Sequence, residues 1–242
     1  MTELQRYLAE EVAEDHADGI LTRREAMRRL GLLGVTGAAA TTMLAAFAPG
    51  AEAAGRRTKS KGRKRNAREG RDVEWAAVET EPITFPGPRG TLMGAWAPAD
   101  KPRGGVLVIH ENRGLTDHIR SVAGRYAAVG YSALAIDLLS EEGGTGAFPD
   151  EAAVAAALAA IEPARFAEDM KAGVTELKTR VKRKKVAATG FCFGGGMTWL
   201  LLTSGEKRLA AAAPFYGPFP EGGSLSRSKT AVVAVYAGPT IA

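Results

Sequence analysis

From residue 73 onward, hydrophobic residues form short continuous runs that alternate with segments of helical spacing. Residues 104–110 (GGVLVIH) and 131–137 (YSALAID) are short apolar runs, which is typical of strands covered on both faces. Between them, apolar residues in 116–130 recur every three or four positions, and Gly130 supplies a stop signal. This stretch therefore predicts a strand, a helix and a second strand.

The flanking segments extend the same pattern. The β-like runs 75–87 and 91–99 are joined by a Pro- and Gly-rich stretch, which predicts an antiparallel hairpin. Residues 149–180 have helical character with a break near Pro163. The remaining elements are expected in the order strand (184–190), helix (194–205), strand (208–217) and strand (229–238).

This alternation of strands and helices predicts an α/β fold with a mostly parallel sheet and helices on both faces. In such sheets, reactive groups collect at the carboxyl ends of the strands. Three candidate segments fall at those ends, namely 110–114 (HENRG), 190–195 (GFCFGG) and 236–240 (YAGPT).

The net charge of +5 is concentrated in one short segment of the 242-residue chain. Residues 54–72 contain nine Lys or Arg against two Asp or Glu, whereas residues 73–242 contain 18 against 17. The folded part is therefore nearly neutral, which argues against a specific nucleic-acid-binding domain. The single cysteine excludes an internal disulfide framework.

Residues 1–53 are expected to form an export signal behind an acidic N-terminal extension. Arg23 and Arg24 precede an apolar run, 30–48, and a small-residue site, Ala51-Glu52-Ala53, follows it. That order of segments is typical of a secretory signal peptide, and the arginine pair resembles a twin-arginine signal. The protein is therefore predicted to be exported to a periplasmic or extracellular location, with a membrane anchor as the alternative.

The basic segment 54–72 is expected to be a disordered linker, because it has almost no apolar residues to bury. A solvated linker is the favoured interpretation. A weak contact of residues 55–71 with an anionic surface is the alternative.

The only cysteine, Cys192, lies in the pattern G-x-C-x-G between a predicted strand and a predicted helix. This arrangement predicts a nucleophile elbow, in which Gly190 and Gly194 relieve crowding around a strained turn. Backbone N–H groups at the start of the helix favour the thiolate, and that of Phe193 is expected to face a developing oxyanion. The alternative is a simply buried thiol.

The segments VLVIHENRG, GFCFGGG and AAAAPFYGP together resemble the dienelactone hydrolase family over roughly residues 80–238. The resemblance implies an α/β-hydrolase fold and cleavage of a small-molecule ester or lactone by a Cys–Asp–His triad, without a metal or organic cofactor. It further implies Cys192 as nucleophile, Glu111 as a carboxylate that governs the thiol, and the backbone N–H groups of Asn112 and Phe193 as the oxyanion hole.

Arg113 is a candidate contact for a substrate carboxylate, and a structural salt bridge is the equal alternative. The family order of nucleophile, acid and histidine places the aspartate near Thr240, but no acid follows Glu221 and no histidine follows His118. The domain 73–242 is therefore expected to lack the last strand and helix of the fold, which would leave an unpaired edge at 230–237.

Three functions remain open from the sequence. The first is a cysteine-dependent hydrolase of esters or lactones. The second is a truncated member of that family with impaired catalysis, because deacylation would lack its histidine. The third is a non-enzymatic protein that binds a surface. His110 is expected to be a core or loop histidine rather than a substitute base.

Overall fold

The computed structural model describes residues 3–17, 21–35, 37–46 and 77–237. Two compact units divide the chain, one formed by 9–75 and the other by 76–242 together with 1–8. The predicted cleavage site, the basic linker and the position near Thr240 lie outside the described residues. The domain limits inferred from the sequence stay predictions.

The N-terminal part forms three helices, α1 (Glu3–Ala17), α2 (Arg23–Leu32) and α3 (Gly37–Ala46). Thr22 caps α2, since its hydroxyl accepts a hydrogen bond from the backbone N–H of Glu25. Gly34 and Gly37 have positive φ angles, so the predicted apolar run is divided between two helices. No helix in the described ranges is long and apolar enough to span a membrane. Export stays a prediction.

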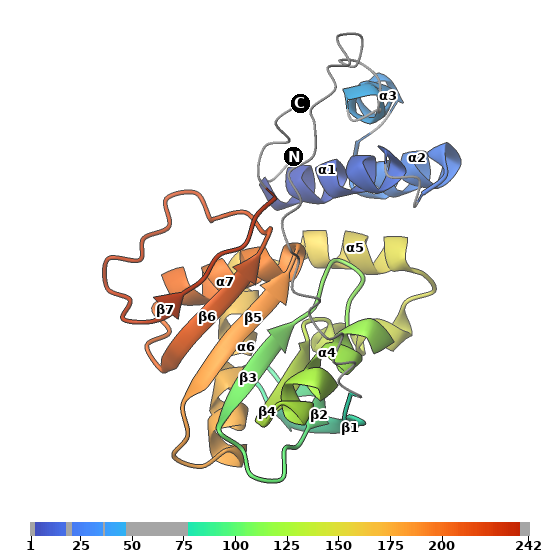
Figure 1. The fold of residues 1–242 in the computed structure, drawn as a ribbon. Helices are drawn as coiled ribbons and strands as arrows, with labels where there is room; N and C mark the ends of the chain where they lie inside the picture. The colour runs from blue at the N-terminus through green and yellow to red at the C-terminus, as the bar shows by residue number, and fades with distance from the viewer. Residues whose placement is uncertain (1–2, 18–20, 36, 47–76, 238–242) are drawn as a thin grey trace, which may run out of the picture. The chain divides into compact units, whose positions relative to one another are not determined.

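A seven-stranded sheet forms the core of the second unit (Figure 1). Its strands lie in the order β1-β2-β4-β3-β5-β6-β7. The β1–β2 and β2–β4 pairs are antiparallel and the other pairs are parallel, which confirms the hairpin and the mostly parallel α/β sheet. The strand bounds are β1 Glu81–Pro86, β2 Thr91–Ala97, β3 Gly104–Ile109, β4 Tyr131–Asp137, β5 Val186–Phe191, β6 Leu209–Phe215 and β7 Ala231–Val232.

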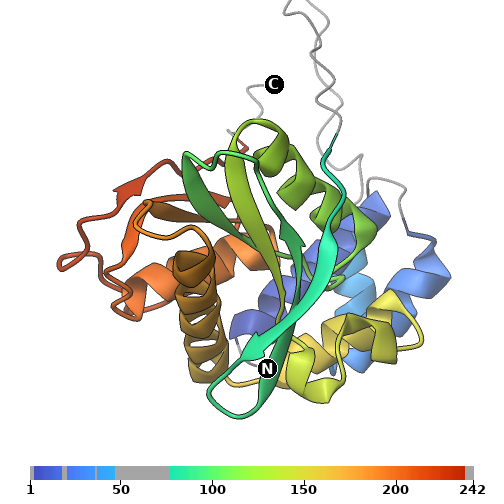
Figure 2. The ribbon, with the colours of Figure 1, turned by 90° about the horizontal axis from the view of Figure 1, so that it is seen from below.

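Helices cover both faces of the sheet (Figures 1 and 2). Val106 and Val108 of β3 join the cluster on α4 (Asp117–Ala128), whereas Leu107 contacts Gly173 of α6 (Pro163–Arg180). Because successive residues of a strand point to opposite faces, one strand fills both layers of the core. The remaining helices are α5 (Glu151–Ala160) and α7 (Phe193–Thr203), and α6 begins at Pro163, as the sequence break predicts.

The predicted strand 229–238 is shorter in the structure. β7 contains two residues, although the backbone N–H groups of Val233 and Val235 still donate to β6 at 3.0 and 3.1 Å. Val233 is 68% exposed, and the α4-side face over β5 and β6 is an open groove whose lining includes seven alanines. Within the described ranges, β7 therefore forms an edge of the sheet with an uncovered neighbouring face, as expected.

A buried carboxylate lies beside the β1–β2 turn, toward the sheet edge opposite β7. The Asp169 side chain on α6 is 1% exposed, and its Oδ1 accepts a 2.7 Å hydrogen bond from Arg89 of the β1–β2 turn. Arg89 also pairs with Glu141 and Glu168. Burial raises the pKa of Asp169 to about 6, although Arg89 opposes this shift.

Asp169 should make stability depend on pH. Its pKa is higher in the folded protein than the value of about 3.9 in an unfolded chain, so the folded state binds the proton more tightly. Relative to Asp169→Asn, the free energy of unfolding of the parent protein should rise by about 2 kcal/mol as the pH falls from about 7 to about 4. Urea titrations of both proteins measure this difference, and a difference that does not change with pH would contradict it.

Candidate active site

Cys192 forms a strained turn between β5 and α7. Its φ of 55° and ψ of −122° lie outside the regions that non-glycine residues ordinarily adopt. The turn is fixed by its backbone, because the N–H of Cys192 donates to the carbonyl of Phe215 and its carbonyl accepts from the N–H of Gly196, both at 3.1 Å. The residue is buried, with 4% of its surface exposed.

The two flanking glycines allow the backbones to approach closely. A Cβ on Gly190 would lie 2.1 Å from the carbonyl oxygen of Gly194. A Cβ on Gly194 would lie 2.4 Å from the carbonyl oxygen of Ile109 at the end of β3. Any larger residue at either position would therefore push α7 away from the sheet.

A second pair of glycines, which sequence reasoning did not single out, packs α7 against the segment after β6. A Cβ on Gly195 would lie 2.2 Å from the carbonyl oxygen of Phe215, and one on Gly217 would lie 2.0 Å from the backbone nitrogen of Gly196. The run GGG and the later YG dipeptide are the sequence signals of this contact. Three strands and one helix thus converge at Cys192.

His110 is a buried structural residue at the end of β3. Its Nδ1–H donates to the carbonyl of Glu111 at 2.7 Å, and its Nε2 accepts from the backbone N–H of Leu138 at 3.1 Å. Burial lowers the pKa of His110, which keeps the ring neutral. Because both ring nitrogens are engaged in these bonds, His110 is not placed to act as the base for Cys192.

The loop after β3 is held by a carboxylate and a hydroxyl that the sequence analysis missed. Asp137, at the end of β4, accepts from the backbone N–H of Thr145 at 2.8 Å and from its hydroxyl at 3.0 Å. The same hydroxyl accepts from the backbone N–H of Leu115 at 2.9 Å. Gly114 is in tight contact with the Thr145 side chain, since a Cβ on Gly114 would lie 2.4 Å from that oxygen.

Glu111 is joined to Tyr216 across the carboxyl end of the sheet. The Tyr216 hydroxyl donates to Oε1 of Glu111 at 3.3 Å. Glu111 follows β3 and Tyr216 follows β6, and β5 lies between those two strands. The bond therefore crosses the end of the strand that leads to Cys192. Tyr216 has a φ of 38°, which is a second strained backbone position at this edge.

The other predicted site residues occupy the same edge. Phe193 is buried at the first position of α7, and its ring stacks on His110 with centroids 6.0 Å apart. Asn112 is half-buried in the loop after β3. Arg113 forms an ion pair with Glu151, with Nε 3.5 Å from the carboxylate. The oxyanion roles of Asn112 and Phe193 and a substrate contact of Arg113 stay predictions.

The remaining histidines lie elsewhere. His118 is exposed on α4, and Nδ1 of His16 lies 2.9 Å from the carbonyl of Leu21. In the part of the chain that the structure describes, no group of three or more His, Cys, Asp or Glu side chains could hold a metal ion. Glu111 follows β3, the strand next to β5, and its role beside Cys192 stays a prediction.

Two curated proteins are similar in sequence to part of this chain. A "Putative carboxymethylenebutenolidase" of Escherichia coli K12 is 31% identical over 139 residues, which cover 55% of this chain and 50% of that protein. A protein of the same description from Methylorubrum extorquens is 30% identical over 115 residues, covering 46% and 39%. The chain thus spans about half the length of these curated relatives or less.

Solved structures show the same fold. A dienelactone hydrolase-like promiscuous phosphotriesterase from metagenomic libraries superposes with a TM-score of 0.55 at 24% identity, covering 68% of this chain and 83% of that one. Dienelactone hydrolase from Anabaena variabilis superposes with a TM-score of 0.53 at 18% identity, covering 66% and 74%. At such identities the likeness shows the α/β-hydrolase fold alone. Residues 92–239 match the family model for the dienelactone hydrolase family, and the chain belongs to that family of hydrolases.

Proposed function

We propose that this protein hydrolyses a small-molecule ester or lactone by covalent attack of Cys192. The strained backbone of Cys192 between β5 and α7 is the observation that carries the proposal, because strain of this kind is retained at a reactive turn. Glu111 and its Tyr216 partner, at the ends of the two adjoining strands, support it. Membership of a hydrolase family supports the reaction class.

The first chemical step needs only groups that the described residues supply. Glu111 takes the thiol proton, and the sulfur attacks the carbonyl carbon of the substrate. The backbone N–H groups of Phe193 and Asn112 stabilise the oxyanion that forms. The carbon–oxygen bond of the ester then breaks, the alkoxide takes a proton from Glu111 and leaves as the alcohol, and a thioester remains on Cys192.

Water completes the cycle by hydrolysing the thioester, which releases the acid and regenerates the thiol. The resemblance implies that an aspartate and a histidine activate this water, and the expected aspartate position near Thr240 is outside the described residues. The second step is therefore the one that differs between a full hydrolase and an impaired one.

Reaction with 4-nitrophenyl acetate tests the proposal. We expect a burst of 4-nitrophenolate equal to the enzyme concentration and an added acetyl group, which peptide mapping by mass spectrometry should assign to Cys192. Continued release after the burst indicates turnover, and a burst alone indicates impaired deacylation. Failure of Cys192 to take the acetyl group, in protein that iodoacetamide still alkylates at this residue, would contradict covalent catalysis.

Thr145 is expected to be a positioning residue for the loop 110–114 after β3, which carries Asn112 and is called the oxyanion loop below. Thr145→Val keeps the shape of the side chain but removes the hydroxyl that links Asp137 to the backbone N–H of Leu115. The loop that carries Asn112 should then be held less rigidly, and acylation by 4-nitrophenyl acetate should slow by about tenfold.

The matched readout is alkylation of Cys192 by iodoacetamide, which needs the thiolate but no oxyanion hole. This rate should stay within about twofold of the parent rate in Thr145→Val. Equal losses in acylation and alkylation would show that Thr145 acts on the thiol or on the fold in general, and not on the loop.

A further inference from the structure

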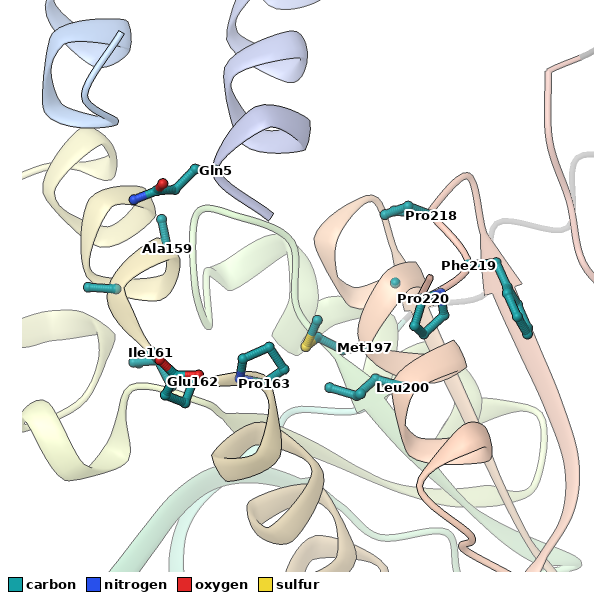
Figure 3. A pocket seen from close by; sticks show the side chains of 12 residues that line it. Gln5, Ala159, Ile161, Glu162, Pro163, Met197, Leu200, Pro218, Phe219 and Pro220 are labelled. Carbon is teal, nitrogen blue, oxygen red and sulfur yellow. The ribbon is translucent and has the colours of Figure 1, made fainter. Parts of the chain in front are cut away.

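A cavity of about 480 Å³ lies beside the first turns of α7 (Figure 3). Besides Gln5, its lining comes from three segments, which are the α5–α6 junction at 159–163, the helix positions Gly196, Met197 and Leu200, and the loop 218–220. The side chains of Met197 and Leu200 on α7 and of Pro163 on α6 point into the same space. This volume is within the range of about 300–1,000 Å³ that small-ligand pockets have.

The cavity adjoins the nucleophile. Gly196 lines the cavity and donates its backbone N–H to the carbonyl of Cys192 at 3.1 Å. Gly196 and Cys192 are therefore one helical turn apart, which is about 5.4 Å along the helix axis. Pro218, in the opposite wall, packs on Gly196, since a Cβ there would lie 3.2 Å from its Cδ. Two residues before Pro218, Tyr216 holds Glu111. The cavity is therefore lined by residues that end or directly follow the two segments of the reactive turn, 192–196 and 216–218.

The lining of the cavity is mostly apolar. Met197, Leu200 and Phe219 contribute large apolar side chains, and the lining residues include neither lysine nor arginine. Glu162 at the α5–α6 junction supplies a carboxylate. A negatively charged substrate group would meet this carboxylate without a compensating cation in the wall.

Two arginines of the surrounding segments already form ion pairs with carboxylates. Arg113 of the oxyanion loop pairs with Glu151, and Arg165 forms two 2.6 Å hydrogen bonds with Glu142. The bidentate pair has the geometry of a strong charge-assisted contact. Recruiting either guanidinium to a substrate carboxylate would first break an existing ion pair.

From these observations we infer that the substrate is a neutral ester with an apolar acyl chain of several carbons, and not an anionic lactone or an ester that bears a second carboxylate. The inference rests on the proposed covalent reaction of Cys192. It adds that the acyl chain lies in the cavity between α7, the α5–α6 junction and the loop 218–220.

A series of 4-nitrophenyl esters tests the substrate class. The second-order rate constant of the nitrophenolate burst is measured for the acetate, butyrate, hexanoate and glutarate monoester, so the test does not require turnover. We expect a gain of about threefold per added methylene up to the hexanoate. The glutarate monoester should react at least about tenfold more slowly than the hexanoate, because its carboxylate meets an apolar wall and Glu162.

Variants of the cavity wall test whether the acyl chain of the substrate binds in the cavity. Leu200→Trp narrows the cavity and should lower the hexanoate rate about tenfold more than it lowers the acetate rate. Val129→Trp, at the exposed C-terminal end of α4, is the matched control and should change neither rate. Glu162→Lys should raise the glutarate rate relative to the hexanoate rate.

The outcomes separate this inference from the proposed function. Equal rates for acetate and hexanoate, or equal losses for both in Leu200→Trp, would overturn the apolar acyl site while Cys192 catalysis stands. A glutarate monoester that reacts faster than the hexanoate would overturn the preference for neutral substrates. Absence of any burst with the acetate would instead contradict the proposed covalent reaction of Cys192.

Discussion

Gly190→Ala and Gly194→Ala are each expected to lower the free energy of unfolding by more than about 3 kcal/mol. In both cases the new methyl group would overlap a backbone carbonyl, at 2.1 Å from Gly194 or at 2.4 Å from Ile109. A backbone atom cannot rotate away as a flexible side chain can. Relief of the overlap would require α7 to separate from β3 or β5, and the elbow would open.

Gly146→Ala is the matched control, because no heavy atom lies within 4 Å of a Cβ built at that position. It should change the free energy of unfolding by less than about 0.5 kcal/mol. Urea titrations of the three variants make the comparison. Where an elbow variant is too unstable to purify, soluble yield and resistance to proteolysis relative to Gly146→Ala give the same ranking. An elbow variant as stable as the control would show that this turn tolerates a side chain.

The strands and helices could be predicted from sequence because their signals are local. Residues 104–110 and 131–137 are continuous apolar runs, and both became strands buried between two layers. The predicted strand at 229–238 was too long for a related reason. A strand gains from burial on its faces, and Val233 is exposed beside an open groove, so regular pairing is short at this edge.

The site was predictable only in part, again for a physical reason. The pattern around Cys192 lies within five consecutive residues, and the crowding that requires its glycines acts between a strand and the helix that follows it. The bond from Tyr216 to Glu111 joins residues 105 positions apart. It exists because β3 and β6 lie on either side of β5, and that order of strands is not encoded in any local pattern.

Contacts between charged groups show the same limit. The sequence left Arg113 with two equal interpretations, and the structure pairs it with Glu151 on the first turn of α5. The supporting role of Asp137 and Thr145 had no sequence signal, because each is an ordinary polar residue near a strand end. Their supporting role arises only because Leu115, 30 positions before Thr145, donates its backbone N–H to the Thr145 hydroxyl.

Cys192→Ser is expected to reduce the rate of acylation by at least about 10³-fold while the free energy of unfolding changes by less than about 1 kcal/mol. The turn is held by backbone hydrogen bonds to Phe215 and from Gly196, and serine keeps both. The smaller oxygen also fits the space of the sulfur. Folding should therefore be preserved, and the loss should reflect chemistry.

Serine is expected to be a poor replacement because the proposed base, Glu111, is a carboxylate. A thiol ionises far more easily than a hydroxyl, so a carboxylate such as Glu111 is able to accept its proton. A serine nucleophile needs an oriented histidine, and His110 already uses both ring nitrogens to join Glu111 and Leu138. Burst kinetics with 4-nitrophenyl acetate measure the loss, with Cys192→Ala as the reference for a site without any nucleophile. A serine variant that acylates at the parent rate would show that a base stronger than Glu111 serves position 192, and the chemistry would then follow the serine hydrolase pattern rather than the thiolate one.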